Sequence, residues 1–215
     1  MENKAINKKA VITGGPGTGK TSVIKELMDR GYKCYDEGSR GIISQINLKG
    51  QTFKSDPLSF SDSLYKARTE HYFDSQKKEY KGKTVFFDRG IPDVTAYMDY
   101  KETPYPERFT ITNETYKYDL IFYFPVWKDI YKQDNERYES YEEALEIHEF
   151  LRKTYKGLGY NLIMVPKTGV SERVEFILSH IKSKASFIVD FVLKASAITD
   201  TEINKSLMGI TGMPS

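Results

Sequence analysis

The sequence lacks the features that mark several common classes of protein. It has one cysteine, Cys34, among 215 residues, so no internal disulfide can form, and a reducing compartment is indicated. The longest apolar run, around 187–193, is interrupted by Asp190 and is too short to span a bilayer. The first nine residues are polar and charged, unlike a secretory signal. We therefore expect a cytoplasmic protein without a membrane-spanning segment.

The chain also lacks an excess of charge of one sign. Its 32 Lys and Arg residues face 30 Asp and Glu residues, and these charges are spread along the sequence. Neither a basic arm for nucleic acid nor an acidic tail is expected. Three histidines, His71, His148 and His180, lie far apart without a metal-ligand spacing, so we expect ordinary helix-face residues. Any anion binding must therefore come from a local motif.

Such a motif is present near the N-terminus. Gly14, Gly19, Lys20 and Thr21 fill the spacing G-x-x-x-x-G-K-[ST], directly after the apolar run 10–12 and before a helical pattern. Glycines let backbone N–H groups fold around an anion, and the following helix adds its N-terminal N–H groups. Lys20 would reach the β- and γ-phosphates, and the Thr21 hydroxyl would hold Mg²⁺. The predicted nucleotide-binding residues of this phosphate-binding loop are Gly15, Gly17, Thr18, Gly19, Lys20, Thr21 and Ser22.

Strand-like and helix-like segments alternate along the rest of the chain. Strands are predicted at 10–12, 32–36, 84–88, 119–124 and 160–165, and helices at 21–30, 38–45, 58–80, 92–100, 107–116, from Ser140, and around Val174 and Ile177. This alternation predicts an α/β P-loop NTPase fold, with a five-stranded parallel sheet and helices on both faces. We expect a P-loop kinase-like domain over 8–184 and a C-terminal helical extension or tail over 185–215.

Acidic residues follow two of the predicted strands. Glu37, with Arg40 nearby, comes just after the second strand, and Asp88 with Arg89 ends the third. Ligands bind at the carboxyl ends of the strands in open α/β sheets. Asp88 is therefore placed to hold Mg²⁺ or its water, together with Thr21. Either Asp88 or Glu37 could be the general base that takes the acceptor's hydroxyl proton, and the sequence does not decide between them.

Four arginines could present a bidentate guanidinium to phosphate: Arg40, Arg68, Arg89 and Arg137. Arg137 lies in the charged, aromatic stretch 127–139, which lacks an apolar stripe and is typical of a lid that closes over the γ-phosphate. We predict catalytic roles for Lys20, Glu37, Asp88, Arg89 and Arg137, with Arg137 also contacting the nucleotide. The acceptor would be bound by Glu37, Arg40, Arg68 and Arg89.

Together these segments resemble a known family: the small P-loop domains related to the kinase part of nicotinamide-riboside kinase/regulator proteins, often labelled AAA-type ATPase domains, within the nucleoside and nucleotide kinase group. The resemblance covers roughly 8–184 and is carried by 11–21, Glu37 with Arg40, the Phe-Asp-Arg-Gly-Ile-Pro-Asp stretch 87–93, 134–139, and Val165-Pro166 ahead of 172–174. It implies that Asp88 and Arg89 serve acceptor and metal, that Arg137 is the lid arginine, and that 166–170 lies beside adenine. Ring-forming AAA machines carry an Asp-Glu pair where Arg89 follows Asp88 here, so we do not expect ring formation.

Two functions remain open. The first is a Mg²⁺-dependent kinase that transfers the γ-phosphate of ATP to a small hydroxyl acceptor, such as a nucleoside, a nucleotide or a related metabolite. The alternative is a nucleotide-dependent switch or binding module, using ATP or GTP with slow hydrolysis, that acts on a protein or lipid partner. A polynucleotide 5′-kinase is disfavoured because there is no basic, aromatic groove signal. The sequence leaves open the acceptor and the oligomeric state, a dimer being one option.

Overall fold

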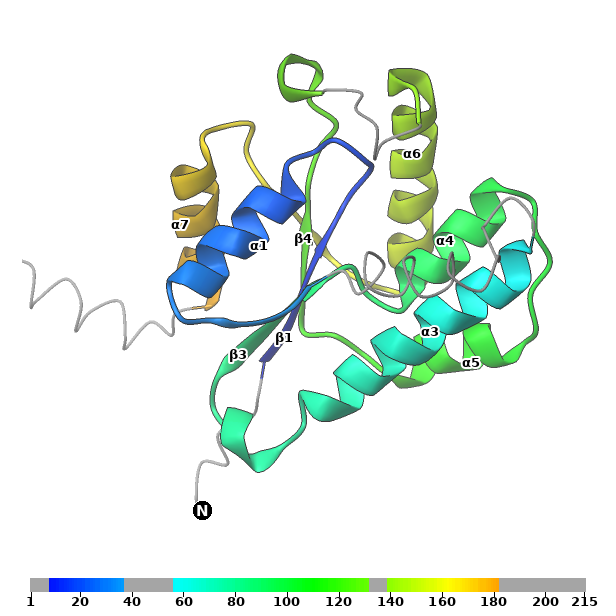
Figure 1. Ribbon diagram of the computed structural model, residues 1–215, viewed down its shortest axis with the longest axis horizontal. Helices are drawn as coiled ribbons and strands as arrows, with labels where there is room; N and C mark the ends of the chain where they lie inside the picture. The colour runs from blue at the N-terminus through cyan, green and yellow to red at the C-terminus, as the bar shows by residue number, and fades with distance from the viewer. Residues whose placement is uncertain (1–7, 37–55, 132–138, 182–215) are drawn as a thin grey trace, which may run out of the picture. The chain divides into compact units, whose positions relative to one another are not determined.

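The computed structural model describes residues 8–36, 56–131 and 139–181 (Figure 1). The chain divides into two compact units, Met1–Ile177 and Leu178–Ser215, and the sheet lies in the first. Several sequence-based predictions lie outside the described residues: the helix at 38–45, most of the lid, the domain boundary at 184, the C-terminal extension 185–215, and the site residues Glu37, Arg40 and Arg137.

The first unit is built on five parallel strands. They are β1 (Lys8–Thr13), β2 (Lys33–Tyr35), β3 (Thr84–Asp88), β4 (Leu120–Tyr123) and β5 (Leu162–Met164), in the spatial order β2-β3-β1-β4-β5. β1 is the central strand, and Ala10, Val11 and Ile12 are fully buried because helices cover both faces of the sheet. The predicted five-stranded parallel sheet is confirmed.

Helices follow the strands as predicted. They are α1 (Lys20–Asp29), α3 (Pro57–Asp74), α4 (Pro92–Tyr100), α5 (Arg108–Thr115), α6 (Tyr141–Gly157) and α7 (Val170–Ile181), with short 3₁₀ turns at Lys78–Tyr80 and Lys128–Ile130. In Figure 1, α1 and the start of α7 lie on one side of the sheet, and α3, α4, α5 and α6 lie on the other. Ala96 of α4 packs with Ile147 and Leu151 of α6 against Tyr123 of β4. None of the helices in the described ranges is both long and apolar enough to cross a membrane.

Two predicted helical features are wrong in detail. The helix predicted to reach Tyr80 ends at Asp74, because the next backbone N–H groups, of Gln76 and Lys77, bond three residues back and tighten the chain. It starts at Pro57, one residue before the predicted start at 58, because proline is tolerated at the first helical position. Arg68 and Tyr72 lie on its buried face.

Two apolar residues of these helices point outward. Met28 of α1 and Leu145 of α6 are each 43% exposed, while Leu27 and Ala144 beside them are buried. Helical spacing gives the approximate direction of a buried stripe, and a residue at its edge can fall on either side. Cys34, by contrast, is a buried residue on β2, as predicted.

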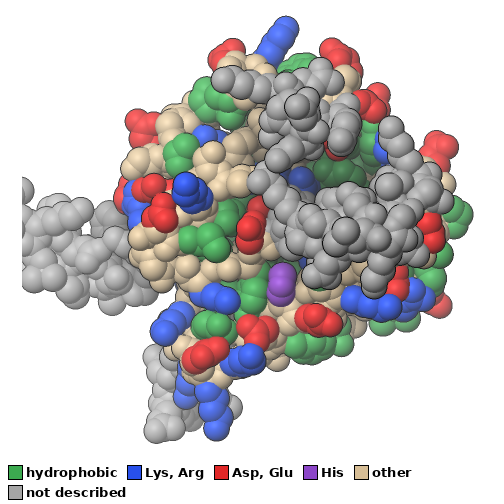
Figure 2. All heavy atoms as spheres, viewed as in Figure 1, with side chains coloured by type: hydrophobic (Ala, Val, Ile, Leu, Met, Phe, Trp, Pro, Cys, Tyr) green, Lys and Arg blue, Asp and Glu red, His purple; other side chains and the backbone are tan. Residues whose placement is uncertain are grey.

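The surface carries both signs of charge. On the face shown in Figure 2, Lys and Arg are interspersed with Asp and Glu over the described residues. Several of these charges pair with each other, as Arg108 does with Asp62 at 2.7 Å and Lys66 with Asp62 at 2.9 Å. Such exposed pairs contribute little to stability.

Candidate active site

The phosphate-binding loop connects β1 to α1, and its shape depends on glycine. Gly14, Gly17 and Gly19 have φ angles of 142°, 73° and 82°, which residues with a Cβ rarely adopt. The loop is also closely covered. A Cβ on Gly15 would lie 2.7 Å from the carbonyl oxygen of Ala144 in α6, and one on Gly14 would meet the carbonyl oxygen of Phe124. The ends of β1 and β4 and the start of α6 therefore hold the loop in place.

Lys20 begins α1 and folds back over the loop. Its Nζ donates hydrogen bonds to the carbonyl oxygens of Gly14 at 2.9 Å and Gly15 at 2.7 Å, and to Oγ1 of Thr18 at 3.2 Å. The lysine is buried, so the loop holds a positive charge at its centre. Thr21 and Ser22 follow in the first turn of α1 and are exposed, and Thr21 is thus accessible to a ligand.

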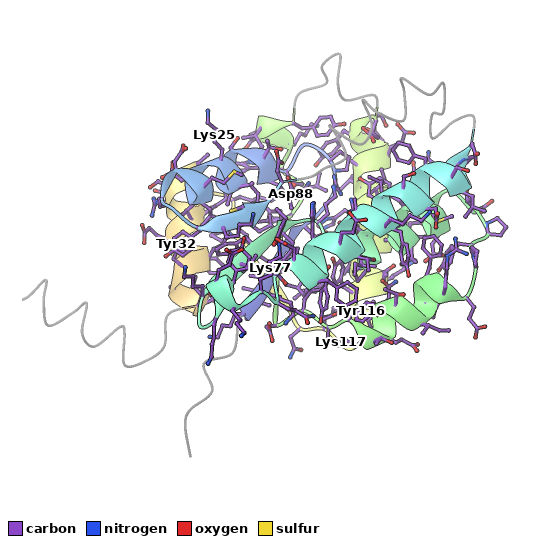
Figure 3. The ribbon with its side chains drawn as sticks, turned by 60° about the horizontal axis from the view of Figure 1, so that its bottom comes forward. Lys25, Tyr32, Lys77, Asp88, Tyr116 and Lys117 are labelled. Atoms are coloured by element: carbon purple, nitrogen blue, oxygen red, sulfur yellow. The ribbon has the colours of Figure 1, made fainter. Side chains whose placement is uncertain are left out.

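Asp88 lies beside the loop strand. β3 pairs directly with β1, and Ile12 is the partner of Asp88 in the register. The carboxylate therefore lies at the same edge of the sheet as the phosphate-binding loop. Asp88 is buried, and Figure 3 shows it at the end of its strand between α1 and α3 in that view. The parallel register, rather than closeness in sequence, brings the acid and the loop together.

Arg89 has an unusual backbone. Its φ is 69°, in the left-handed region, and its N–H donates to the carbonyl oxygen of Ile12 at 3.0 Å. A non-glycine residue in this region costs on the order of 1 kcal/mol or more, and such residues cluster at functional sites. The guanidinium is buried, 3.6 Å from the carboxylate of Asp93 and over the ring of Tyr97.

Asp93 holds this segment together, and the sequence had assigned it no role. It lies fully buried in the first turn of α4. Its Oδ1 accepts a hydrogen bond from Thr13 at 2.7 Å, and its Oδ2 accepts from the Gly90 N–H at 3.0 Å and the Tyr155 hydroxyl at 2.5 Å. Thr13 directly precedes the phosphate-binding loop, so one carboxylate joins the loop strand, the Asp88-Arg89 turn and α6. The second acid of the stretch 87–93 was the signal that could have indicated it.

Of the other predicted arginines, the structure describes only Arg68. Its guanidinium is buried and donates to the carbonyl oxygen of Gly90 at 3.2 Å. Arg68 is thus brought to the Asp88-Arg89 turn from α3. Glu37, Arg40 and Arg137 lie outside the described residues, and their roles stay predictions.

Two further side chains, which sequence analysis did not assign to the site, lie at the phosphate-binding loop. Arg173, in the first turn of α7, donates from Nη1 to the carbonyl oxygen of Thr18 at 3.0 Å. His148 of α6 stacks on Tyr123 with ring centroids 4.3 Å apart and lies beside Gly15. Burial lowers the pKa of Arg173, and burial lowers the pKa of His148 to about 4, so this imidazole is neutral near pH 7. Arg173 and Thr18 are 155 residues apart in sequence, so no local pattern could have paired them.

The donor set fits a nucleoside triphosphate with Mg²⁺. The loop offers glycine backbone, a buried ammonium and the N-terminus of α1, which together suit phosphate. Within the described ranges no three or more His, Cys, Asp or Glu residues cluster as a metal site. A Mg²⁺ ion would therefore be held by few protein oxygens, those of Thr21 and Asp88, with phosphates and water completing its shell, as this ion prefers.

Comparison with known proteins places the chain in a family. A family model described as an AAA domain matches residues 9–173. The chain belongs to this AAA domain family. No curated protein sequence matches it significantly.

Solved structures with the same fold include three kinase-related proteins. A deoxyadenosine kinase from M. mycoides with dCMP and a flexible dCDP bound is 17% identical, with a TM-score of 0.61 over 80% of this chain and 98% of that one. The NadR protein in complex with NR is 15% identical, with a TM-score of 0.61 over 83% of this chain and 52% of that one. Thymidylate kinase from Candida albicans is 18% identical, with a TM-score of 0.58 over 82% and 91%. These structural similarities confirm the predicted nucleoside-kinase-like P-loop fold for this member of the AAA domain family.

Proposed function

We propose that this protein is a Mg²⁺-dependent kinase that transfers the γ-phosphate of ATP to a hydroxyl group of a small acceptor, a nucleoside, a nucleotide or a related metabolite. The observation that carries the proposal is the pairing of β3 with β1, because it sets Asp88 and the strained Arg89 directly beside the phosphate-binding loop. The fold that the chain shares with deoxyadenosine and thymidylate kinases supports the acceptor class.

Each described residue of the candidate site has a role in this reaction that its position supports. Lys20 and the loop N–H groups hold the phosphates of the donor, and Thr21 ligates Mg²⁺. Bound Mg²⁺ neutralises phosphate charge. Asp88 orients the metal or its water, or it takes the acceptor's proton, with Glu37 as the other candidate base. Arg89, held by Asp93, stabilises negative charge on the transferred group.

The test is ADP release from ATP and Mg²⁺ by the purified full-length protein. The acceptor panel contains deoxynucleosides, nucleosides, nucleoside monophosphates and nicotinamide riboside. A kinase shows ADP release that rises about tenfold or more with one acceptor class, and mass spectrometry detects the phosphorylated acceptor. GTP in place of ATP tests the choice of donor.

Variants connect the activity to the site. Lys20→Ala removes the ammonium that stabilises charge on the transferred phosphate. Asp88→Asn removes the carboxylate that orients Mg²⁺ or its water, or that takes the acceptor's proton. Each variant is expected to lower acceptor-dependent turnover about 100-fold or more. Lys25→Ala, on an exposed position of the same helix, is the matched control and leaves turnover unchanged. Tight nucleotide binding with no acceptor dependence would reject the kinase and favour the nucleotide-dependent switch.

A further inference from the structure

We infer that Arg173 binds the polyphosphate of the nucleotide. This residue belongs to α7, near the C-terminal end of the domain's sequence, and its side chain reaches the phosphate-binding loop. This rests on the proposed function in one respect only, that a nucleoside triphosphate occupies the loop. It adds a residue from outside the motifs that define the loop and the Asp88-Arg89 turn.

The first observation is the burial of an arginine whose charge is not neutralised. Arg173 is 5% exposed, and among the described residues no carboxylate lies within ion-pair distance of it. Burial is the one cause that shifts its pKa, and it shifts it downward, against the charged form. A buried charge without a partner is costly, so natural proteins keep one chiefly where a ligand supplies the counter-charge.

The second observation is the set of unused donors. A guanidinium has five N–H groups, and the hydrogen bond to Thr18 uses one of them. Nε is buried and has no acceptor among the described residues. The carbonyl of Thr18 accepts one bond and carries no net charge, so it orients Arg173 without neutralising it.

The third observation is where the guanidinium is held. A Cβ on Gly19 would lie 2.8 Å from Nη1 of Arg173, so the charge lies against the last glycine before α1. The rings of Trp127 and Phe124 lie 5.7 and 5.8 Å from the guanidinium carbon. Aromatic faces exclude water and restrict the side chain, and they favour a cation without supplying the anion. Phosphate oxygens at the N-terminus of α1 are acceptors of the required charge and geometry.

This assignment predicts opposite effects on stability and on binding. Replacing Arg173 by Met removes an unneutralised buried charge while keeping an unbranched apolar stem, so the ligand-free protein should melt at the same temperature or higher. Its affinity for ATP, and for tripolyphosphate alone, should fall by about 10- to 100-fold, the range for one charge-assisted contact. Arg173→Lys keeps the positive charge and loses the bidentate guanidinium, so the affinity of this variant should lie between those of the wild type and Arg173→Met.

The experiment is titration calorimetry with Mg²⁺ and ATP, ADP or tripolyphosphate, together with thermal unfolding with and without each ligand. Arg30→Gln is the matched control. Arg30, which directly follows α1, bonds Glu175 and Ser171 of α7, so this variant loosens α7 from the end of α1 without touching the loop. It should lower the melting temperature slightly and leave the affinities unchanged.

Four results would overturn the assignment or the proposed function on which it rests. A lower melting temperature of ligand-free Arg173→Met with unchanged affinity would show a structural brace. A loss of affinity for ATP but not for tripolyphosphate would place Arg173 at the nucleoside instead. A wild-type protein that binds none of the three ligands would reject the proposed function itself, whereas normal binding by Arg173→Met would reject only this inference.

Discussion

At the scale of single residues, the turn after Asp88 has little room for an added side chain. An added Cβ on Gly90 would lie 2.6 Å from the Tyr155 hydroxyl and 3.2 Å from the ring of Tyr118. Tyr155 is fully buried and cannot move aside. We therefore expect Gly90→Ala to lower the free energy of unfolding by about 2 to 3 kcal/mol, the cost of overpacking a rigid site. Chemical denaturation measures this loss.

The cause of that loss can be separated from a general effect of removing glycine. Tyr155→Phe deletes the nearest atom, so the double variant should lose less stability than the sum of the two single variants. Gly157→Ala is the matched control, because nothing lies within 4 Å of its added Cβ at the end of α6. It should raise stability by about 0.5 kcal/mol. Strict additivity of Gly90→Ala and Tyr155→Phe would contradict the predicted contact.

At the scale of elements, α6 begins with a capping box. Ser140 accepts a hydrogen bond from the Glu143 N–H at 3.1 Å, and Glu143 Oε2 accepts from the Ser140 N–H at 2.7 Å, as the sequence pattern predicted. Ser140→Ala should lower the free energy of unfolding by about 1 kcal/mol. Ser140→Asp retains the cap and should cost little. Equal losses for both variants in chemical denaturation would exclude capping as the cause.

The elements were predictable because local periodicity decides them. Strand β3 and helix α4 begin and end where their apolar patterns do, and Gly31, with a φ of 83°, follows the end of α1. The errors arise where a neighbour decides. The buried face of α3 contains Arg68 and Tyr72 because this helix packs beside α4 and the Gly90 turn. The spacing of apolar residues within α3 does not encode those partners.

At the scale of the whole molecule, the site was predicted only in part. The loop and Asp88-Arg89 are contiguous motifs with recognisable chemistry, so the sequence located them. Asp93, Tyr155 and Arg173 act through contacts that span 62 to 155 residues, which exist only once the sheet is assembled. A sequence shows which residues can do chemistry, whereas burial and pairing show which of them position the others.

Assembly of the molecule also creates a dependence of stability on pH. Burial lowers the pKa of His148 from 6.5 to about 4, so between these values the unfolded chain binds a proton that the folded chain does not. The free energy of unfolding therefore falls as the pH drops from about 6.5 to 4. A pKa shift of this size corresponds to about 3 kcal/mol, which the partial solvent exposure of His148 reduces to the order of 2 kcal/mol. This contribution is constant below pH 4. The same cause lowers the pKa of His71 and adds a change of the same sign.

His148→Gln should flatten the profile of unfolding free energy between pH 4 and 6.5, measured by chemical denaturation at a series of pH values. The loss of stacking on Tyr123 lowers stability at every pH, so the slope, rather than the level, is the informative quantity. His71→Gln should remove a separate part of the slope, and the double variant should be flatter than either. Wild-type and His148→Gln profiles that run parallel would show that this imidazole titrates normally in the folded protein.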